Sequence, residues 1–276
     1  MVLGVAQDAG HPHVGCLRPC CERARRDPSL GHLAACLGVV SGMGSRFLID
    51  ATPDLPAQVH ALDAESSLAG IVLTHAHIGH YTGLMYLGRE AWNTRRVPVY
   101  VMPRMARFLT EHGPWSQLVA LGNIELVPLQ AGHRERLAPD LEVEPIVVPH
   151  RDEFSETVGV LVHGPSRSVA WVPDSDGWSS WRPGVRELVE RVDVAFLDGT
   201  FFDERECPGR DAAEVPHPLV SSSLGAFASW PEELRERVRF VHLNHTNPLL
   251  DPVSAASQLV AKAGHGVARR GQVIDL

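Results

Sequence analysis

The sequence lacks the features typical of membrane, secreted and nucleic-acid-binding proteins. Its longest apolar stretches, such as residues 34–40, are much shorter than a membrane span requires. The first ten residues contain neither a basic segment nor a long apolar segment, so we expect no signal peptide and a cytoplasmic location. The formal net charge is -8, and a protein of that charge needs a local basic patch to bind nucleic acid. We therefore expect a small-molecule substrate and neither a membrane nor nucleic acid as a partner.

The sequence also lacks the cysteine pattern of a disulfide-stabilised protein. Its 5 cysteines are an odd number, and no secretion signal accompanies them. Three of them, Cys16, Cys20 and Cys21, lie close together near the N-terminus, and the chain contains 15 histidines. Because thiolates and imidazoles are the usual protein ligands of zinc, this composition favours metal binding.

No repeat, low-complexity tract or long linker divides the 276 residues, so we predict a single domain over residues 1–276. Strands are predicted from β-branched and apolar runs at residues 46–50, 70–74, 97–101, 142–148, 158–162, 168–172, 192–197 and 238–243. Helices are predicted at residues 20–26, 54–62, 80–91, 103–111, 185–190, 221–228 and 231–236. Pro98 favours an edge position for its strand. The strands gather in two halves with helices between them, which favours two sheets covered by helices.

Three histidines follow the predicted strand at residues 70–74 without a gap. His75, His77 and His80 open the next helix, and a turn at this point can direct all three imidazoles at one metal ion. Further candidate polar side chains lie at or just after the ends of other predicted strands, namely Asp50, His150, Asp174, His242 and His245. These histidines and aspartates are therefore candidate ligands of a metal site.

The order of these residues resembles the metallo-β-lactamase superfamily over the whole chain. The resemblance implies an α/β fold, an αββα sandwich of two mixed β-sheets flanked by helices, with metals at one edge. It also implies that His75, His77 and His150 are ligands of a first metal and that His80 and His242 are ligands of a second metal. Asp174 corresponds to the carboxylate that bridges the two metals. Asp50 corresponds to the residue that orients a ligand histidine.

One departure from this superfamily concerns the second metal. The motif HxHxDH has Gly79 in place of its aspartate, so the second site loses a carboxylate. The polar residues that remain unassigned nearby in the pattern are Asp8, His11, His13, Asp176 and His217.

The cysteine-rich segment, at about residues 11–28, resembles the CxCxxC…RARRDP segment of the cyclic phosphodiesterase from carbon–phosphorus lyase pathways. That family binds a structural zinc through three cysteines and a late histidine. The resemblance implies a structural Zn²⁺ held by Cys16, Cys20, Cys21 and His245. It also implies that His217, in a late loop, is a general acid or a substrate contact. The opening VLGVAQDAGHP and the closing HLNHTNPLLDP resemble the pyrroloquinoline quinone biosynthesis B family as well.

Three functions stay open at this point. The first is a metal-dependent hydrolase, in which a metal-activated water attacks an ester, lactone or phosphodiester, Asp174 holds the nucleophile and His217 protonates the leaving group. The second is an oxygen-dependent enzyme with non-haem iron, which Gly79 favours because it opens coordination space. The third is a non-catalytic metal-binding protein. The active site is expected to hold one or two of Zn²⁺, Mn²⁺ or Fe²⁺. The sequence does not specify an oligomeric state, and a homodimer is one state that the resemblance allows, because many relatives are dimers.

Overall fold

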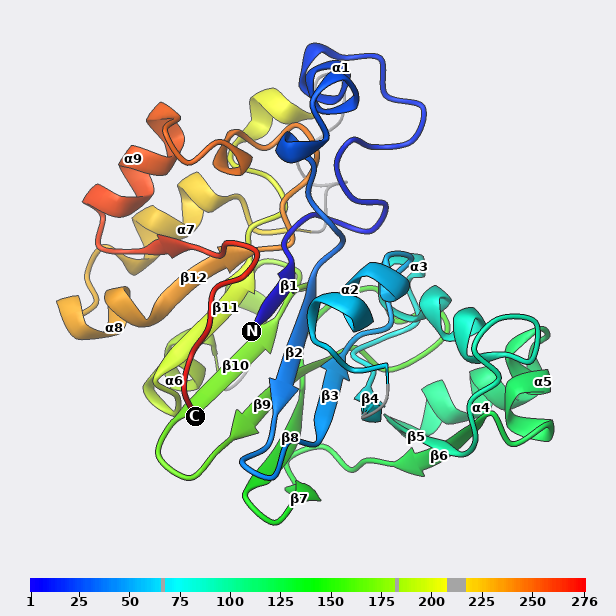
Figure 1. Ribbon diagram of the computed structural model, residues 1–276. Coiled ribbons are helices and arrows are strands. Elements are labelled where there is room, and N and C mark those ends of the chain that lie inside the picture. The colour runs from blue at the N-terminus through cyan, green and yellow to red at the C-terminus, as the bar shows by residue number, and fades with distance from the viewer. Residues whose placement is uncertain (66–67, 182–183, 208–216) are drawn as a thin grey trace.

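The computed structural model describes residues 1–65, 68–181, 184–207 and 217–276, and in these ranges the chain forms two β-sheets with helices around them (Figure 1). The first sheet has the strand order β1 (Val2–Gly4), β2 (Cys36–Val40), β3 (Arg46–Ile49), β4 (Leu68–Val72), β5 (Val97–Val101) and β6 (Ile124–Pro128). The second sheet has the order β13 (Gly266–Val267), β12 (Val238–Val241), β11 (Val194–Asp198), β10 (Ser168–Val172), β9 (Val158–His163), β8 (Leu141–Val147) and β7 (Glu135–Ala138). Both sheets are mixed.

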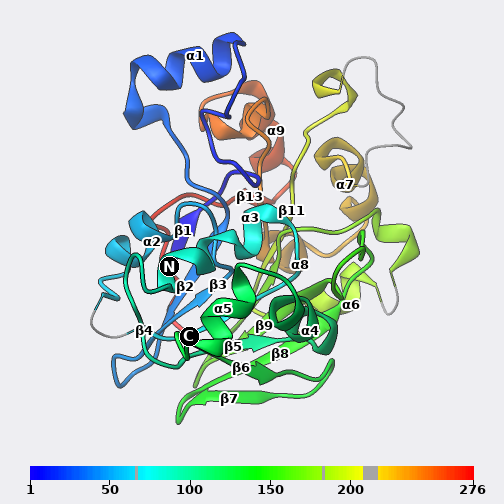
Figure 2. The same cartoon turned by 90° about the vertical axis from the view of Figure 1, so that its right-hand side faces the viewer.

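Most helices lie on the outer sides of the two sheets, while α1 (Pro19–Arg26) lies beyond the strand ends at the top of Figure 1. Figures 1 and 2 show α3, α4 and α5 on the side of the first sheet and α7, α8 and α9 on the side of the second. The helices are α1 (Pro19–Arg26), α2 (Leu55–Ala61), α3 (Ile78–Tyr81), α4 (Pro103–Glu111), α5 (Trp115–Ala120), α6 (Val185–Glu190), α7 (Val220–Phe227), α8 (Glu232–Arg237) and α9 (Ala255–Lys262). Short 3-10 turns complete the described ranges: η1 (Pro28–Leu30), η2 (Thr82–Leu87), η3 (Trp178–Ser180), η4 (Glu204–Glu206) and η6 (Pro248–Leu250). No helix in these ranges is long and apolar enough to cross a membrane.

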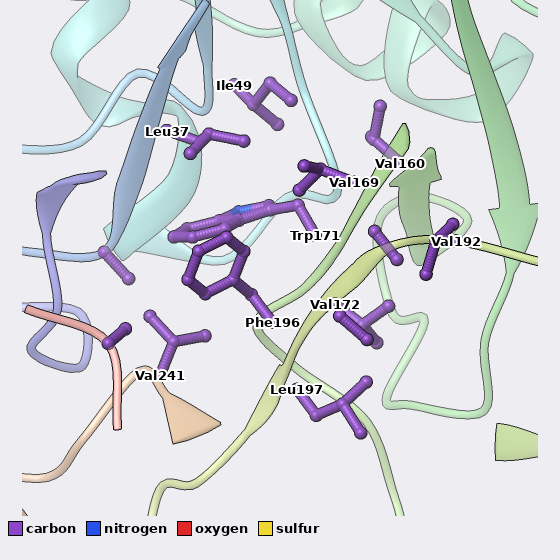
Figure 3. Packing of buried hydrophobic residues seen from close by; sticks show 14 of the residues in the cluster. Leu37, Ile49, Val160, Val169, Trp171, Val172, Val192, Phe196, Leu197 and Val241 are labelled. Atoms are coloured by element: carbon purple, nitrogen blue, oxygen red, sulfur yellow. The ribbon is translucent and has the colours of Figure 1, made fainter. Parts of the chain in front are cut away.

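The alternation of side chains along each strand builds two cores. In β3, Phe47 and Ile49 enter the core between the sheets, whereas Leu48 enters the core beneath the outer helices. Figure 3 shows Ile49 close to Trp171 of the second sheet, which is fully buried. Each sheet therefore buries both of its faces, as the αββα sandwich predicted from the resemblance requires, and the fold class is confirmed.

Strand direction brings the polar strand ends together. In the second sheet, β10, β11 and β12 are parallel. Strand β8 runs in the same direction, because β9 is antiparallel to both β8 and β10. In the first sheet, β3 is parallel to β4. The carboxyl ends of five of these strands, β3, β4, β8, β10 and β12, carry or precede residues predicted for the site, and β11 ends at Asp198. The sheets thus act as a scaffold that presents six loops or strand ends to one edge.

Two local predictions were wrong for identifiable reasons. The helix expected at residues 80–91 is replaced by α3 and η2, because Gly83 packs directly on the chain at Thr52, where a Cβ atom would lie 2.1 Å from the Thr52 carbonyl oxygen. Strand β5 is not at an edge, since it lies between β4 and β6. Its pairing with β4 involves only Val99 and Tyr100, so the missing N–H of Pro98 falls outside that ladder.

Candidate metal centre

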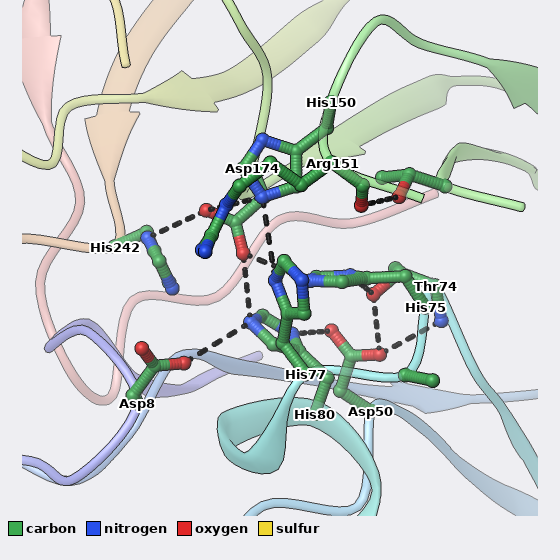
Figure 4. Close-up of polar contacts among 12 residues, drawn as sticks. Asp8, Asp50, Thr74, His75, His77, His80, His150, Arg151, Asp174 and His242 are labelled. Carbon is green, nitrogen blue, oxygen red and sulfur yellow. Dashed lines mark hydrogen bonds and ion pairs between the residues drawn. The ribbon is translucent and has the colours of Figure 1, made fainter. Parts of the chain in front are cut away.

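The first group of potential metal ligands consists of His75, His77, His150 and Asp174, whose donor atoms all lie within 4.8 Å of one another. His75 and His77 lie in the turn between β4 and α3, while His150 and Asp174 follow β8 and β10. His75 Nε2 lies 3.2 Å from one Asp174 oxygen, and His77 Nδ1 lies 3.3 Å from His150 Nε2. Figure 4 shows these side chains converging from both sheets. The structure therefore brings together the whole first ligand set expected from the sequence.

The second group consists of Asp8, His80 and His242, again with donor atoms within 4.8 Å of one another. Asp174 links the two groups, because the oxygen that faces His75 also lies 3.0 Å from His80 Nε2. His80 and His242 were predicted for this site, whereas Asp8 was only an unassigned candidate. The carboxylate that the motif lacks at Gly79 is thus matched in space by one from the loop after β1.

Asp50 fixes the orientation of two of these histidines from beneath the site. Its Oδ2 lies 2.8 Å from His80 Nδ1, and its Oδ1 accepts hydrogen bonds from the Thr74 amide and hydroxyl. Because the Thr74 hydroxyl donates to Asp50, it accepts from Nδ1 of His75, 3.0 Å away. Both imidazoles therefore carry a proton on Nδ1 and turn Nε2 toward the centre, where Nε2 can bind a metal in its unprotonated state. Asp176 holds His150 in the same way, with 3.1 Å between its Oδ1 and His150 Nδ1.

Burial and charge set the ionisation of the centre. Burial opposes the ionisation of Asp174, but His242, His75 and His80 outweigh it and hold the pKa of Asp174 well below its usual range. Burial, with the nearby His80, holds the pKa of His75 well below its usual range. Burial also lowers the pKa of His242. Burial disfavours a charged His80, but Asp50 and Asp174 outweigh it and hold the pKa of His80 well above its usual range. The centre therefore contains an ionised carboxylate beside neutral His75 and His242, and a metal that binds His80 must displace the proton on its Nε2.

His217 and Asp198 form a buried pair beside Asp174. His217 Nδ1 lies 2.8 Å from Asp198 Oδ2 and 3.6 Å from Asp174 Oδ1. Burial disfavours a charged His217, but the charge and hydrogen bond of Asp198 outweigh it and raise the pKa of His217 to about 9. Asp198 is itself fixed by hydrogen bonds from the Ser175 amide and the Thr200 amide. The preceding loop residues 214–216 lie outside the described residues.

Sequence reasoning did not assign Asp198 to the site. The signal that could have found it is the one that found Asp50, because Asp198 is the last residue of a buried parallel strand. For Asp8 the sequence offered no comparable signal beyond its place in the first loop. His11 and His13 do not join the centre, since His11 contacts the Leu30 and Cys20 carbonyls and the His13 ring lies 4.5 Å from that of His245.

A separate cluster lies where α1 meets the segment after β12. The donor atoms of Cys16, Cys21 and His245 lie within 4.8 Å of one another, as expected for a zinc site. Cys20 was expected as a further ligand, but it lies outside this group, with its Sγ 4.0 Å from that of Cys21. Cys20 and Cys21 are consecutive in α1, so their side chains point about 100° apart around the helix axis. The structure therefore supports three of the four ligands proposed for the structural zinc.

Comparison with known proteins places the chain in a family. A family model described as a beta-lactamase superfamily domain matches residues 45–254, which is more than half of the chain. The chain belongs to this family. Two curated relatives are named coenzyme PQQ synthesis protein B: the protein of Xanthomonas campestris is 25% identical over 306 residues and that of Methylococcus capsulatus 28% over 310 residues. Each alignment covers 100% of this chain and 99% of the relative.

Two solved structures show the same fold over almost the whole chain. Zinc-bound PqqB from Methylobacterium extorquens superposes with a TM-score of 0.83 at 21% identity, covering 100% of this chain and 99% of the other. A diphosphatase of the PhnP family superposes with a TM-score of 0.71 at 22% identity, covering 99% and 94%. These likenesses confirm the superfamily fold and the resemblance to this branch that the motifs indicated.

Proposed function

We propose that the protein is a metal-dependent hydrolase of an ester, lactone or phosphodiester-type small molecule. The observation that carries this proposal is the arrangement of two donor groups linked by the Asp174–His80 contact, with the buried His217–Asp198 pair directly beside them. A carrier that only binds metal has no need of such a pair. A hydrolase does, because a leaving group requires a proton.

The donor set fits divalent metal ions. The Nε2 atoms of His75, His80 and His242 are buried and have no hydrogen-bond partner among the described residues, and neither has one oxygen of Asp174. Unpartnered buried polar atoms are costly, so four of them facing one region indicate a ligand that satisfies them. A divalent metal bound there would lower the pKa of its water and polarise the bond to be cleaved.

The residues of the chain supply the remaining chemistry. Asp174 is ionised and faces both groups, so it can hold the attacking water by accepting its hydrogen bond. His217 receives a fixed orientation from Asp198 at Nδ1, which leaves Nε2 as the nitrogen that can donate a proton to a leaving group. Phe201, whose ring lies 6.0 Å from that of His217, provides an apolar contact next to this proton donor.

The oxygen-dependent alternative loses its structural argument. It was favoured because Gly79 opens coordination space, but Asp8 lies where that space would be. The names of the curated relatives remain its support, and metal identity separates it from hydrolysis, since a firmly bound iron with oxygen consumption is expected only for an oxidative enzyme.

The test compares His217→Asn with His112→Asn, a matched change at an exposed histidine that contacts Phe108. Proteins with equal measured metal content are assayed on bis(p-nitrophenyl) phosphate, p-nitrophenyl esters and lactones. We expect turnover by the parent and by His112→Asn, and a loss of about 10²- to 10⁴-fold in kcat for His217→Asn. A fully metal-loaded parent that hydrolyses none of these substrates would contradict the proposal and favour the non-catalytic or the oxidative alternative.

A further inference from the structure

We propose that Asp8, in the loop after β1, is a ligand of the second metal and supplies the carboxylate that the histidine motif lacks at Gly79. The inference rests on the metal centre of the proposed function but not on hydrolysis, so it can be tested by metal binding without a substrate.

Three unpartnered atoms define this site. Asp8 Oδ1, His80 Nε2 and His242 Nε2 are buried, and each lacks a hydrogen-bond partner among the described residues. The distance from Asp8 Oδ1 to His80 Nε2 is 3.8 Å, which is too long for a hydrogen bond. It is short enough for both atoms to reach one ion at about 2.0–2.2 Å. The three residues come from remote parts of the chain, so their convergence is not a by-product of one local turn.

The packing at Gly79 shows why the motif carries glycine. A Cβ atom at this position would lie 2.3 Å from Asp8 Oδ1 and 2.5 Å from Asp8 Cα. Any side chain there would therefore collide with Asp8, including the aspartate of the motif. We infer that the carboxylate was not simply lost but is delivered from another segment into the same space.

The loop that carries Asp8 is attached to the segment that carries His242. The amide of Leu243 donates to the Val5 carbonyl, and the amide of Gln7 donates to the Leu243 carbonyl. Asp8 has a φ of 31° and His242 a φ of 63°, both in a region that residues other than glycine rarely adopt. Such strain is kept where the surrounding structure enforces it, and it is common at ligand sites. Here both strained residues direct side chains to the same group.

The first experiment compares Asp8→Asn with Asp27→Asn. Asp27 is an exposed aspartate of the same N-terminal region whose side chain bonds only Ser29 within the described residues. Each full-length protein is freed of active-site metal and titrated with Co²⁺, with calorimetry and metal analysis counting the sites. A thiolate charge-transfer band marks any Co²⁺ bound by the cysteines.

We expect Asp27→Asn to match the parent in both active-site affinities. Loss of a residue that merely supports a ligand costs about 10- to 100-fold in metal affinity, so loss of a ligand should cost at least tenfold. Asp8→Asn should therefore bind the second metal at least tenfold more weakly and keep the first. Unchanged second-site affinity would overturn the proposal, as would an equal loss at both sites, because Asp8 belongs to the second group alone.

A second experiment approaches the contact from the other side. Gly79→Ala leaves Asp8 in the sequence but forces the two segments apart, while Gly225→Ala adds a methyl group in α7 where nothing lies within 4 Å. We expect Gly79→Ala to weaken the second metal and Gly225→Ala to leave it unchanged. In the background of Asp8→Asn, Gly79→Ala should add little further loss, because the ligand it displaces is already gone. A second-site affinity unaltered by Gly79→Ala, or fully additive losses, would overturn the inference.

Discussion

Substitution of Asp50 by asparagine should remove the second active-site metal selectively. The reason is the direction of its hydrogen bonds. One Asp50 oxygen accepts from the Thr74 backbone amide, a donor that cannot reverse its direction, so the asparagine carbonyl must take that position. The new NH₂ group then faces His80 Nδ1, 2.8 Å from the second oxygen in the parent. His80 must accept at Nδ1 and therefore carry its proton on Nε2, where it can no longer bind a metal.

The magnitude follows from the role of Asp50 as an orienting residue. Loss of such a partner costs about 10- to 100-fold in metal affinity. That range corresponds to about 1.4–2.7 kcal/mol. The first metal should change little, because His75 is held by the Thr74 hydroxyl, which can still donate to the asparagine carbonyl.

Asp176→Asn is the matched control for this prediction. Asp176 orients His150 in the first group, but its side-chain oxygen contacts only His150 Nδ1 among the described residues. An asparagine there can rotate to present its carbonyl, so its effect on the first metal should be several times smaller. Calorimetric titration with metal analysis measures both sites. If Asp50→Asn weakened the first metal as much as the second, or Asp176→Asn proved equally damaging, the assignment of proton positions would be refuted.

Three further results are expected. His77→Ala should remove the first active-site metal and leave the structural zinc bound, as metal analysis per chain will show. Cys21→Ser should release that zinc, lower the melting temperature and weaken the second active-site metal, because the same N-terminal segment carries Asp8; an unchanged second-site affinity would contradict the link. Burial raises the pKa of Glu206 to about 7, although bonds from Thr246 and the Phe202 amide oppose this. The folded protein thus keeps a proton that the unfolded chain releases above about 4.5. The free energy of unfolding therefore falls as the pH rises from about 4.5 to about 7, and the loss is complete above the pKa of the folded protein. Glu206→Gln should remove this loss, worth at most about 3 kcal/mol in urea unfolding at pH 8.

The strands that form the centre of each sheet could be predicted from the sequence, and the short or exposed ones could not. The strands β3, β10 and β12 are apolar runs with clear ends, and each was predicted within about two residues. In contrast, β7 has the sequence ERLA with one buried residue, and β1 has three residues. Such segments become strands because a neighbour supplies hydrogen bonds and a buried face, which their own composition does not specify.

The metal centre was predictable to the extent that its ligands follow strands. His75, His150 and Asp174 stand directly after apolar runs, and parallel strand direction brings those ends together. Asp8 follows no such rule, because its place depends on a tertiary contact with the segment after β12. Cys20 stays a prediction from the resemblance, since its Sγ lies 4.0 Å from that of Cys21 but outside the group formed by Cys16, Cys21 and His245.

Two of the candidate metal sites, the second group and the cysteine cluster, share their supporting segments. Residues 5–21 supply Asp8 to one site and Cys16 and Cys21 to the other, while residues 241–245 supply His242 and His245 in the same order. The backbone bonds between Leu243 and the first loop lie between the two sites. A metal bound at the cysteine cluster would therefore restrict the loop that positions Asp8, and loss of that metal would lower the effective concentration of the carboxylate at the active site. Under the two proposals above, a metal at the cysteine cluster would therefore influence metal occupancy at the second group, although it lies apart from the proposed reaction.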